Sequence, residues 1–303
     1  MSLYLGIDTS NYTTSVAICG DEELNIRKII DVKEGMRGIR QSDGVFVHLK
    51  TLPQLIDSME VDFSEVNAIG VSTRPRDIQG SYMPVFVAGE SFAKVMAKTL
   101  SVPLYSYSHQ DGHIMAGIKS TNAYELLDLP FTAVHLSGGT TEILSCRYEN
   151  GRFNAKIIGG TRDISAGQLI DRIGVSLGMK FPCGKEMDAL SKNCDKPMKL
   201  KTSVSEGYMN LSGMETKLLE LAKTEDSALI AKSAICFVAE SLKTALTQLK
   251  CENILFAGGV SSNSYLREYL RNNLDTNTYF ASPELSCDNA MGIAELCRLD
   301  SMR

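Results

Sequence analysis

The sequence predicts an α/β protein built from two similar halves. Two segments share one pattern, an apolar run, a short turn of small hydroxyl-bearing or glycine residues, and a second apolar run. The first segment runs from Leu5 to Ile18 and has Thr9-Ser10-Asn11 in its turn. The second runs from Val134 to Leu144 and has Ser137-Gly138-Gly139 in its turn. Each pattern predicts a β-hairpin, and the alternation of strands and helices after each hairpin defines the α/β class.

The tips of the two hairpins favour an actin-like ATPase fold. Each tip exposes backbone N–H groups and hydroxyls, which are the donors that a phosphate needs. Two such tips in one chain suggest two half-domains that face each other across a nucleotide. We therefore predict a two-lobed actin-like (ASKHA, ribonuclease H-like) fold with a nucleotide cleft between the lobes. We expect the first lobe over residues 1–125, with the C-terminal helix 286–303 packing back onto it, and the second over residues 126–285.

The remaining elements repeat one plan in both halves. After the first hairpin we expect a buried strand, a helix with small packing residues, a short strand and the start of another helix, at 68–72, 84–100, 103–105 and 108–117. After the second hairpin, at 132–146, we expect two helices, a strand and a last helix, at 164–178, 226–249, 253–257 and 288–299. No Pro-rich or Ser-rich linker separates the halves, so the boundary rests on the repeated hairpin.

Composition and charge narrow the function classes. The chain has 303 residues, of which 44% are hydrophobic and 22% charged, as in ordinary globular proteins. Its net charge of −5 argues against a protein that coats nucleic acid by itself. The eight cysteines include no CxxC pair, and no leader or long apolar span precedes Gly6. We therefore expect a reduced, cytoplasmic protein that does not associate with membranes.

Two of the four histidines, His109 and His113, lie four residues apart. If this segment is helical, both imidazoles project from one face at metal-binding distance. A third ligand must come from elsewhere, and Asp288 is the carboxylate best suited by its context. Such a set suits Fe, Zn or Mn, and it also suits binding a phosphate or polarising a carbonyl. Paired helix-capping roles are the alternative interpretation.

Three glycine-containing segments are candidates for nucleotide binding. Ser137-Gly138-Gly139 lets the backbone approach a phosphate closely, although a tight hairpin needs glycines in any case. The run from Ala257 to Arg267 follows a buried strand and opens a helix, where a nucleotide can lie over glycine backbone. Beside Gly167, Asp171 could hold ribose hydroxyls, whereas Asp163 could simply cap the helix, the commoner role of an Asp at such a place. No GxGxxG fingerprint occurs, so we do not expect hydride transfer.

Together these motifs resemble the tRNA threonylcarbamoyladenosine synthases, a family of the actin-like ATPase superfamily formerly labelled O-sialoglycoprotein endopeptidases. The matching motifs follow the family's order: Gly6-Ile7-Asp8-Thr9-Ser10, His109-Gln110-Asp111-Gly112-His113, Ser137-Gly138-Gly139, Ala166-Gly167 with Asp171, Ala257-Gly258-Gly259-Val260 with Asn263, and Asp288-Asn289-Ala290. The resemblance implies an acyltransferase. It would move a threonylcarbamoyl group from threonylcarbamoyl-AMP to the adenosine beside the anticodon of tRNA, in t6A synthesis, and release AMP.

The resemblance also implies which residues and partners take part. One divalent metal, Fe, Zn or Mn, would be held by His109, His113 and Asp288. The first turn, with Thr9, Ser10 and Asn11, would be catalytic. An adenine nucleotide (threonylcarbamoyl-AMP, AMP or ATP) would contact Ser137, Gly138, Gly139, Gly167, Asp171, Gly184, Gly258, Gly259 and Asn263. The partners would be tRNA, a smaller homologous actin-like subunit and an ATPase subunit, and the chain itself could form a homodimer.

The first turn departs from the family's pattern. Members usually follow the first Thr-Ser with Cys-Asp-Glu-Thr, whereas this chain has Asn11-Tyr12-Thr13-Thr14, so both carboxylates are missing. If those acids deprotonate or orient the attacking amine, their loss lowers turnover. Two alternatives therefore stay open. One is a non-catalytic or regulatory nucleotide- and metal-binding paralogue, and the other is a carbamoyltransferase or kinase that acts on a small metabolite.

Overall fold

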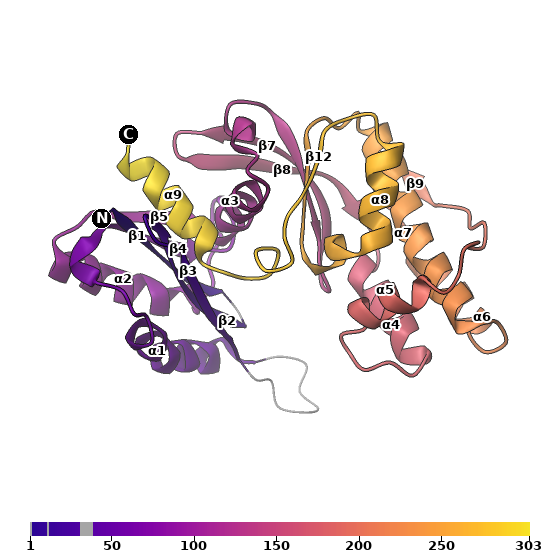
Figure 1. The fold of residues 1–303 in the computed structure, drawn as a ribbon, viewed down its shortest axis with the longest axis horizontal. Helices are drawn as coiled ribbons and strands as arrows, with labels where there is room; N and C mark the ends of the chain where they lie inside the picture. The colour runs from indigo at the N-terminus through magenta and orange to yellow at the C-terminus, as the bar shows by residue number, and fades with distance from the viewer. Residues whose placement is uncertain (1, 11, 31–38) are drawn as a thin grey trace. The chain divides into compact units, whose positions relative to one another are not determined.

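The computed structural model describes residues 2–10, 12–30 and 39–303, which form two compact units (Figure 1). Unit 1 comprises Met1–Tyr124, Tyr148–Asn154 and Glu284–Arg303, and unit 2 comprises Glu125–Arg147 and Ala155–Pro283. Asn11, which we predicted to be catalytic, lies outside the described residues. In the part of the chain that the structure describes, no helix has the length and apolar character needed to cross a membrane.

The sheet of unit 1 has five strands in the order β3-β2-β1-β4-β5. Their bounds are β1 Leu3–Ser10, β2 Thr13–Gly20, β3 Leu24–Ile29, β4 Val66–Arg74 and β5 Leu104–Ser108. β1 and β2 form the predicted hairpin, with Ser10 opposite Thr13. β4 pairs in parallel with both β1 and β5. β1 is buried along its whole length, as expected for a strand covered on both faces.

Helices cover both faces of this sheet (Figure 1). They are α1 Gln41–Asp57, α2 Phe86–Leu100, α3 His109–Thr121 and α9 Met291–Ser301, with a 3-10 turn at Phe63–Glu65. Leu5 and Ile7 of β1 belong to the same apolar cluster as residues of α1 and α2. Side chains alternate along a strand, so the intervening Gly6 faces the opposite side, where it meets α9.

Glycines allow α9 to pack very closely in unit 1. A Cβ added at Gly6 or Gly70 would lie within 3 Å of α9 atoms or of Ala290, a distance that real Cβ atoms essentially never show. On α3, a Cβ at Gly112 would meet Ile293 in the same way. On α9 itself, a Cβ at Gly292 would collide with the backbone of α3. These positions therefore fix how α9, and the segment that precedes it, lie against β1, β4 and α3.

The sheet of unit 2 has seven strands in the order β12-β11-β6-β7-β8-β10-β9. The strands are β6 Phe131–Leu136, β7 Thr141–Glu149, β8 Arg152–Thr161, β9 Val204–Ser205, β10 Tyr208–Met209, β11 Ile254–Ala257 and β12 Thr278–Phe280. β6 and β7 form the second predicted hairpin, with Leu136 opposite Thr141. β11 runs parallel to both β6 and β12, so the carboxyl ends of these three strands share one edge of the sheet.

The helices of unit 2 build its apolar core around the longest of them, α7. They are α4 Ala166–Ser176, α5 Gly184–Ser191, α6 Ser212–Leu221, α7 Ser227–Gln248 and α8 Ser264–Asn273, with 3-10 turns at Tyr124–Leu127 and Gly259–Ser262. α7 starts at an Asp226 cap that accepts from the N–H groups of Ala228 and Leu229. Phe237 and Leu242 of α7 are buried against Phe256 of β11 in one cluster.

Some elements were not predicted from the sequence. The main omission is α1, in which Gly44 and Pro53 interrupt the helical pattern of apolar residues. Asp163 does not cap α4 as the sequence suggested, because Ser165 is the N-cap of that helix. Asp163 instead accepts hydrogen bonds from the N–H groups of Leu211 and Ser212, at the start of α6.

We predict that Gly292→Ala destabilises the protein by about 1–3 kcal/mol, because the added methyl group forces α9 away from α3. Gly213→Ala in α6 is the matched control. No atom lies within 4 Å of a Cβ added there, so this helical substitution should cost nothing. Urea unfolding of the two variants and the wild type measures the difference, and equal stability of all three would contradict the packing argument.

Candidate functional site

The start of α3 places His109 and His113 one helical turn apart. Ser108 caps the helix, since its hydroxyl accepts from the N–H of Asp111 while the Asp111 carboxylate accepts from the N–H of Ser108. The two imidazole rings meet edge to face with centroids 4.4 Å apart. Their Nε2 atoms lie 2.9 Å from each other. The spacing of the two histidines thus gives one shared face, as the sequence indicated.

Asp288, from the segment just before α9, completes a group of three potential ligands with the two histidines. Its Oδ1 lies 3.1 Å from Nε2 of His113 and 3.6 Å from Nε2 of His109. Its Oδ2 accepts from the Thr13 hydroxyl at 3.2 Å, and its backbone carbonyl accepts from Arg27 at 3.3 Å. All three ligand atoms lie within 4.8 Å of one another.

The donor set and its dimensions fit a divalent metal ion. Nitrogen and oxygen ligands lie about 2.0–2.2 Å from zinc, which sets neighbouring donor atoms roughly 3–3.5 Å apart. The three separations between Nε2 of His109, Nε2 of His113 and Oδ1 of Asp288 agree with that range to within a few tenths of an ångström. Two imidazoles and one carboxylate leave further coordination positions open for substrate or water.

The charges at this centre favour a bound cation. Burial by itself would raise the pKa of Asp288, but hydrogen bonds and charge from His109 and His113 hold it well below its usual range. Burial would likewise lower the pKa of His109, but the carboxylates of Asp8 and Asp288 raise it to about 10. The protonated imidazole of His109 therefore places a positive charge between the carboxylates of Asp8 and Asp288. A bound metal ion would supply a positive charge in its place.

Asp8 is a site residue that reasoning from sequence missed. Its Oδ2 lies 2.6 Å from Nδ1 of His109, whereas Asp288 faces the other ring nitrogen, Nε2. The signal was present, because Asp8 directly follows an apolar run that predicts a buried strand, and acidic residues are almost never fully buried unless paired. Its partner, however, lies 101 residues away along the chain.

The predicted catalytic residues of the first turn differ in their surroundings. The hydroxyl of Thr9 is fully buried, donates to the carbonyl of Val85 at 3.0 Å and accepts from the N–H of Gly89 at 3.2 Å. Thr9 therefore anchors the start of α2. The hydroxyl of Ser10 is buried and has no hydrogen-bond partner among the described residues. A catalytic role for this turn stays a prediction.

In unit 2, the predicted nucleotide-binding residues gather at the carboxyl ends of β6 and β11. The β6–β7 turn is closed by hydrogen bonds between Ser137 and Thr140 in both directions. The Ser165 hydroxyl donates to the carbonyl of Gly138 at 2.7 Å, which ties the start of α4 to this turn. A Cβ at Gly167 would collide with the same turn, and one at Gly258 would collide with Leu136.

Two other predicted residues act in local capping. Asp171 Oδ1 accepts from the N–H of Cys183 at 2.8 Å, which fixes the loop that leads to Gly184 and α5. Asn263 Oδ1 accepts from the N–H of Leu266 at 3.0 Å and caps α8. The N–H of Ser264 at the start of α8 donates to Asp188 of α5 at 3.2 Å. Hydrogen bonds thus connect α5 with the start of α8 within unit 2.

The glycines in this region fall into two classes. Gly167 and Gly258 are required by packing, and Gly258 also has a φ of +95°. Four others have no atom within 4 Å of an added Cβ and no left-handed φ: Gly138, Gly139, Gly184 and Gly259. Within the described part of the chain, the N–H groups of Gly138 and Gly139 donate to no acceptor. Neither packing nor backbone conformation explains these four glycines, whereas close approach of a ligand to the backbone does.

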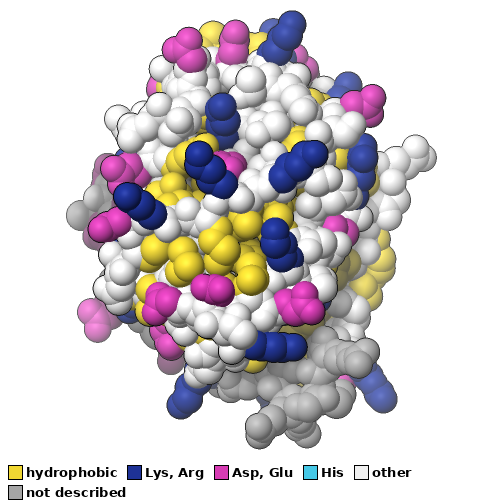
Figure 2. All heavy atoms as spheres, turned by 90° about the vertical axis from the view of Figure 1, so that its right-hand side faces the viewer, with side chains coloured by type: hydrophobic (Ala, Val, Ile, Leu, Met, Phe, Trp, Pro, Cys, Tyr) yellow, Lys and Arg dark blue, Asp and Glu magenta, His cyan; other side chains and the backbone are white. Residues whose placement is uncertain are grey.

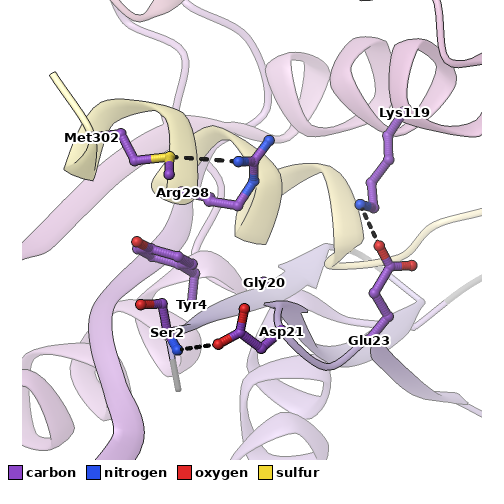
Figure 3. Close-up of a pocket in the computed structure, with 8 residues that line it drawn as sticks. All are labelled: Ser2, Tyr4, Gly20, Asp21, Glu23, Lys119, Arg298 and Met302. Atoms are coloured by element: carbon purple, nitrogen blue, oxygen red, sulfur yellow. Dashed lines mark hydrogen bonds and ion pairs between the residues drawn. The ribbon is translucent and has the colours of Figure 1, made fainter.

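A separate pocket in unit 1 is not a candidate site (Figure 3). It is lined by Ser2, Tyr4, Gly20, Asp21, Glu23, Lys119, Arg298 and Met302. Its charged groups already have partners, since Lys119 pairs with Glu23 at 2.7 Å and the N–H of Ser2 donates to Asp21 at 2.8 Å. Arg298 pairs with the fully buried Glu295. The ion pairs of Lys119 and Arg298 engage both basic side chains that line the pocket, and the Asp21 carboxylate is engaged by a backbone N–H.

Comparison with known proteins gives one consistent family. The family model of tRNA N6-adenosine threonylcarbamoyltransferase matches residues 47–295. A protein of that name from Thermus thermophilus is 30% identical over 96% of this chain and 90% of its own length. Another, from Mycoplasmopsis synoviae, is 30% identical over 96% of both chains. A third, from Thermosipho africanus, is 29% identical over 96% of this chain and 92% of its own.

Solved structures confirm the predicted fold. Component A of (R)-2-hydroxyglutaryl-CoA dehydratase from Acidaminococcus fermentans has a TM-score of 0.59 at 15% identity and is covered over 100% of both chains. A ROK family glucokinase from Streptomyces griseus has a TM-score of 0.53 at 12% identity, over 98% of this chain and 99% of its own. Both are actin-like ATPase relatives, so the chain has the actin-like fold.

We predict that alanine substitutions separate the two classes of glycine. Gly259→Ala should change stability by less than about 0.5 kcal/mol but weaken adenine-nucleotide binding about tenfold. Gly258→Ala should instead destabilise unit 2 by more than about 1 kcal/mol, because its φ and its contact with Leu136 both exclude a side chain. Thermal melting and calorimetric titration with AMP provide the two readouts. If Gly259→Ala binds AMP as tightly as the wild type, Gly259 is not part of the nucleotide-binding site.

Proposed function

Because the chain belongs to the tRNA N6-adenosine threonylcarbamoyltransferase family, we propose that it is a metal-dependent synthase of threonylcarbamoyladenosine in tRNA. The group transferred would come from threonylcarbamoyl-AMP, and the acceptor would be the adenosine beside the anticodon. The observation that carries the proposal is the convergence of His109, His113 and Asp288 from two distant parts of the chain. A tRNA acceptor implies that the enzyme works in the cytoplasm.

The proposed metal is held by the two Nε2 atoms and by Oδ1 of Asp288. Thr13 and Arg27 hold Asp288 through the hydrogen bonds described above, Thr13 at Oδ2 and Arg27 at the backbone carbonyl. When bound, a divalent ion would act as a Lewis acid that polarises a carbonyl or stabilises charge on a phosphate. Iron, zinc and manganese all accept this donor set.

The residues of unit 2 would bind the adenylate and its leaving group. In the reaction, the exocyclic amine of adenosine forms a C–N bond to the carbamoyl carbon, and the bond from that carbon to the phosphate oxygen breaks. AMP departs with the negative charge, and the amine nitrogen loses one proton to solvent. The free N–H groups of Gly138 and Gly139, with the start of α4 tied to their turn, are donors suited to that phosphate. Gly184 and Gly259 leave room for the rest of the nucleotide.

The tRNA would be bound together with partner subunits. The net charge of the chain is −5, and on the face shown in Figure 2 lysine and arginine side chains alternate with acidic ones around an apolar area. That face offers no continuous basic surface for an RNA backbone. We therefore propose a smaller homologous actin-like subunit and an ATPase subunit as partners, and the oligomeric state of the chain itself is to be measured for a homodimer.

One observation favours a second candidate function. Thr13, the first residue of β2, stands where the resemblance to the family implies a carboxylate, and its hydroxyl donates to Asp288. A turn without an acid has no general base for the attacking amine. The second candidate is accordingly a non-catalytic paralogue that binds metal and nucleotide through the same residues.

Nucleoside analysis of tRNA distinguishes the two candidates. Unmodified tRNA is incubated with the protein, threonylcarbamoyl-AMP and the partner subunits of the same organism, and the digest is examined by mass spectrometry. We predict threonylcarbamoyladenosine, and a rate at least about 100-fold lower in His109→Ala. Gly213→Ala in α6, which lies outside the proposed centre and the nucleotide-binding turns, is the control that should keep the activity. No product, where a standard synthase gives it, would favour the non-catalytic paralogue.

A further inference from the structure

Asp8 is buried beneath the proposed metal centre and uses both carboxylate oxygens. It is 1% exposed and lies in β1, next to β4. The hydroxyl of Ser72 in β4 donates to Oδ1 at 2.7 Å, and Oδ2 lies 2.6 Å from Nδ1 of His109. Two strands of the sheet therefore hold this carboxylate rigidly against one ring nitrogen.

The burial of Asp8 requires a positive partner, because an unpaired carboxylate in a protein interior is strongly destabilising. Ser72 donates a hydrogen bond but carries no charge. His48, a fully buried histidine near this carboxylate, is bonded to Thr14 at 2.7 Å. Burial lowers the pKa of His48 to about 4, so its ring is neutral at pH 7. The positive partner of Asp8 is thus the ring of His109, or a cation bound to the other nitrogen of that ring.

We infer that Asp8, held in place by Ser72, is a positioning residue that makes Nε2 of His109 the metal-binding atom. A carboxylate only accepts hydrogen bonds, so the facing Nδ1 must carry a proton. When the ring is neutral, its lone pair is then on Nε2, which points at His113 and Asp288. The contact also fixes the plane of the ring and increases the basicity of the ligand nitrogen.

This inference rests on the proposed metal centre, and the variant Asp8→Asn tests it. An amide of the same shape carries no charge and accepts the Nδ1 proton more weakly than a carboxylate does. If its NH2 group faces Nδ1, the ring proton moves to Nε2 and blocks the ligand atom. We expect Asp8→Asn to bind Co²⁺ about 10–100-fold more weakly than the wild type and to alter the visible d–d spectrum. Ser72→Ala keeps the Asp8 carboxylate but removes one hydrogen bond that holds it. This variant should therefore lose less Co²⁺ affinity than Asp8→Asn.

Thr14→Val is the matched control for damage to the hairpin. It removes a fully buried hydrogen bond from the strand paired with β1 but leaves the contact between Asp8 and His109 unchanged. Its Co²⁺ affinity and spectrum should stay those of the wild type even if its unfolding midpoint in urea falls. Equal Co²⁺ binding by Asp8→Asn and wild type would overturn the positioning role.

The outcomes also separate this inference from the proposed centre. If the wild type and His109→Ala bind Co²⁺ equally, the centre itself is wrong. If only His109→Ala loses binding, the centre holds and the role of Asp8 fails. If Asp8→Asn does not fold, nitrogen NMR of the zinc-loaded wild type tests the same role of Asp8, because it shows which nitrogen of His109 carries the proton. We expect a proton on Nδ1 of His109, and zinc bound at Nδ1 would contradict the inference.

Discussion

The proposed centre depends on the close packing of α9 against β1, β4 and α3. Asp288 lies three residues before α9, so the position of this helix decides where the carboxylate reaches. Gly6 and Gly70 leave space on the sheet, and Gly112 and Gly292 leave space between the two helices. A single methyl group at any of these points would separate the helix from its support and the carboxylate from the histidines.

The two histidines are fixed by different means from Asp288. The capping box of Ser108 and Asp111 sets where α3 begins, and hence the direction in which His109 and His113 point. The second oxygen of Asp111 accepts from the N–H of Phe153 at 3.1 Å, so the start of β8 is bonded to the same carboxyl group. Asp8 then holds His109 from the sheet. Every ligand of the centre is thus supported by a buried hydrogen bond or a rigid element.

The sequence predicted local features well and distant ones poorly. Both hairpins and the helix that carries His109 and His113 follow from short-range patterns, and the structure contains them. The pairing of Asp8 with His109 and the contact of Asp163 with α6 join residues far apart in the chain, so spacing could not indicate them. The same holds for the glycines, because only the fold shows that Gly258 is required by packing while Gly259 is not.

The most direct test of this account is anomalous diffraction at the metal absorption edge, from crystals of the protein loaded with cobalt or zinc. The account predicts one strong peak in unit 1, bonded to Nε2 of His109, Nε2 of His113 and Oδ1 of Asp288, with open positions toward solvent or substrate. A peak held by other residues, or none at these three atoms, would contradict it.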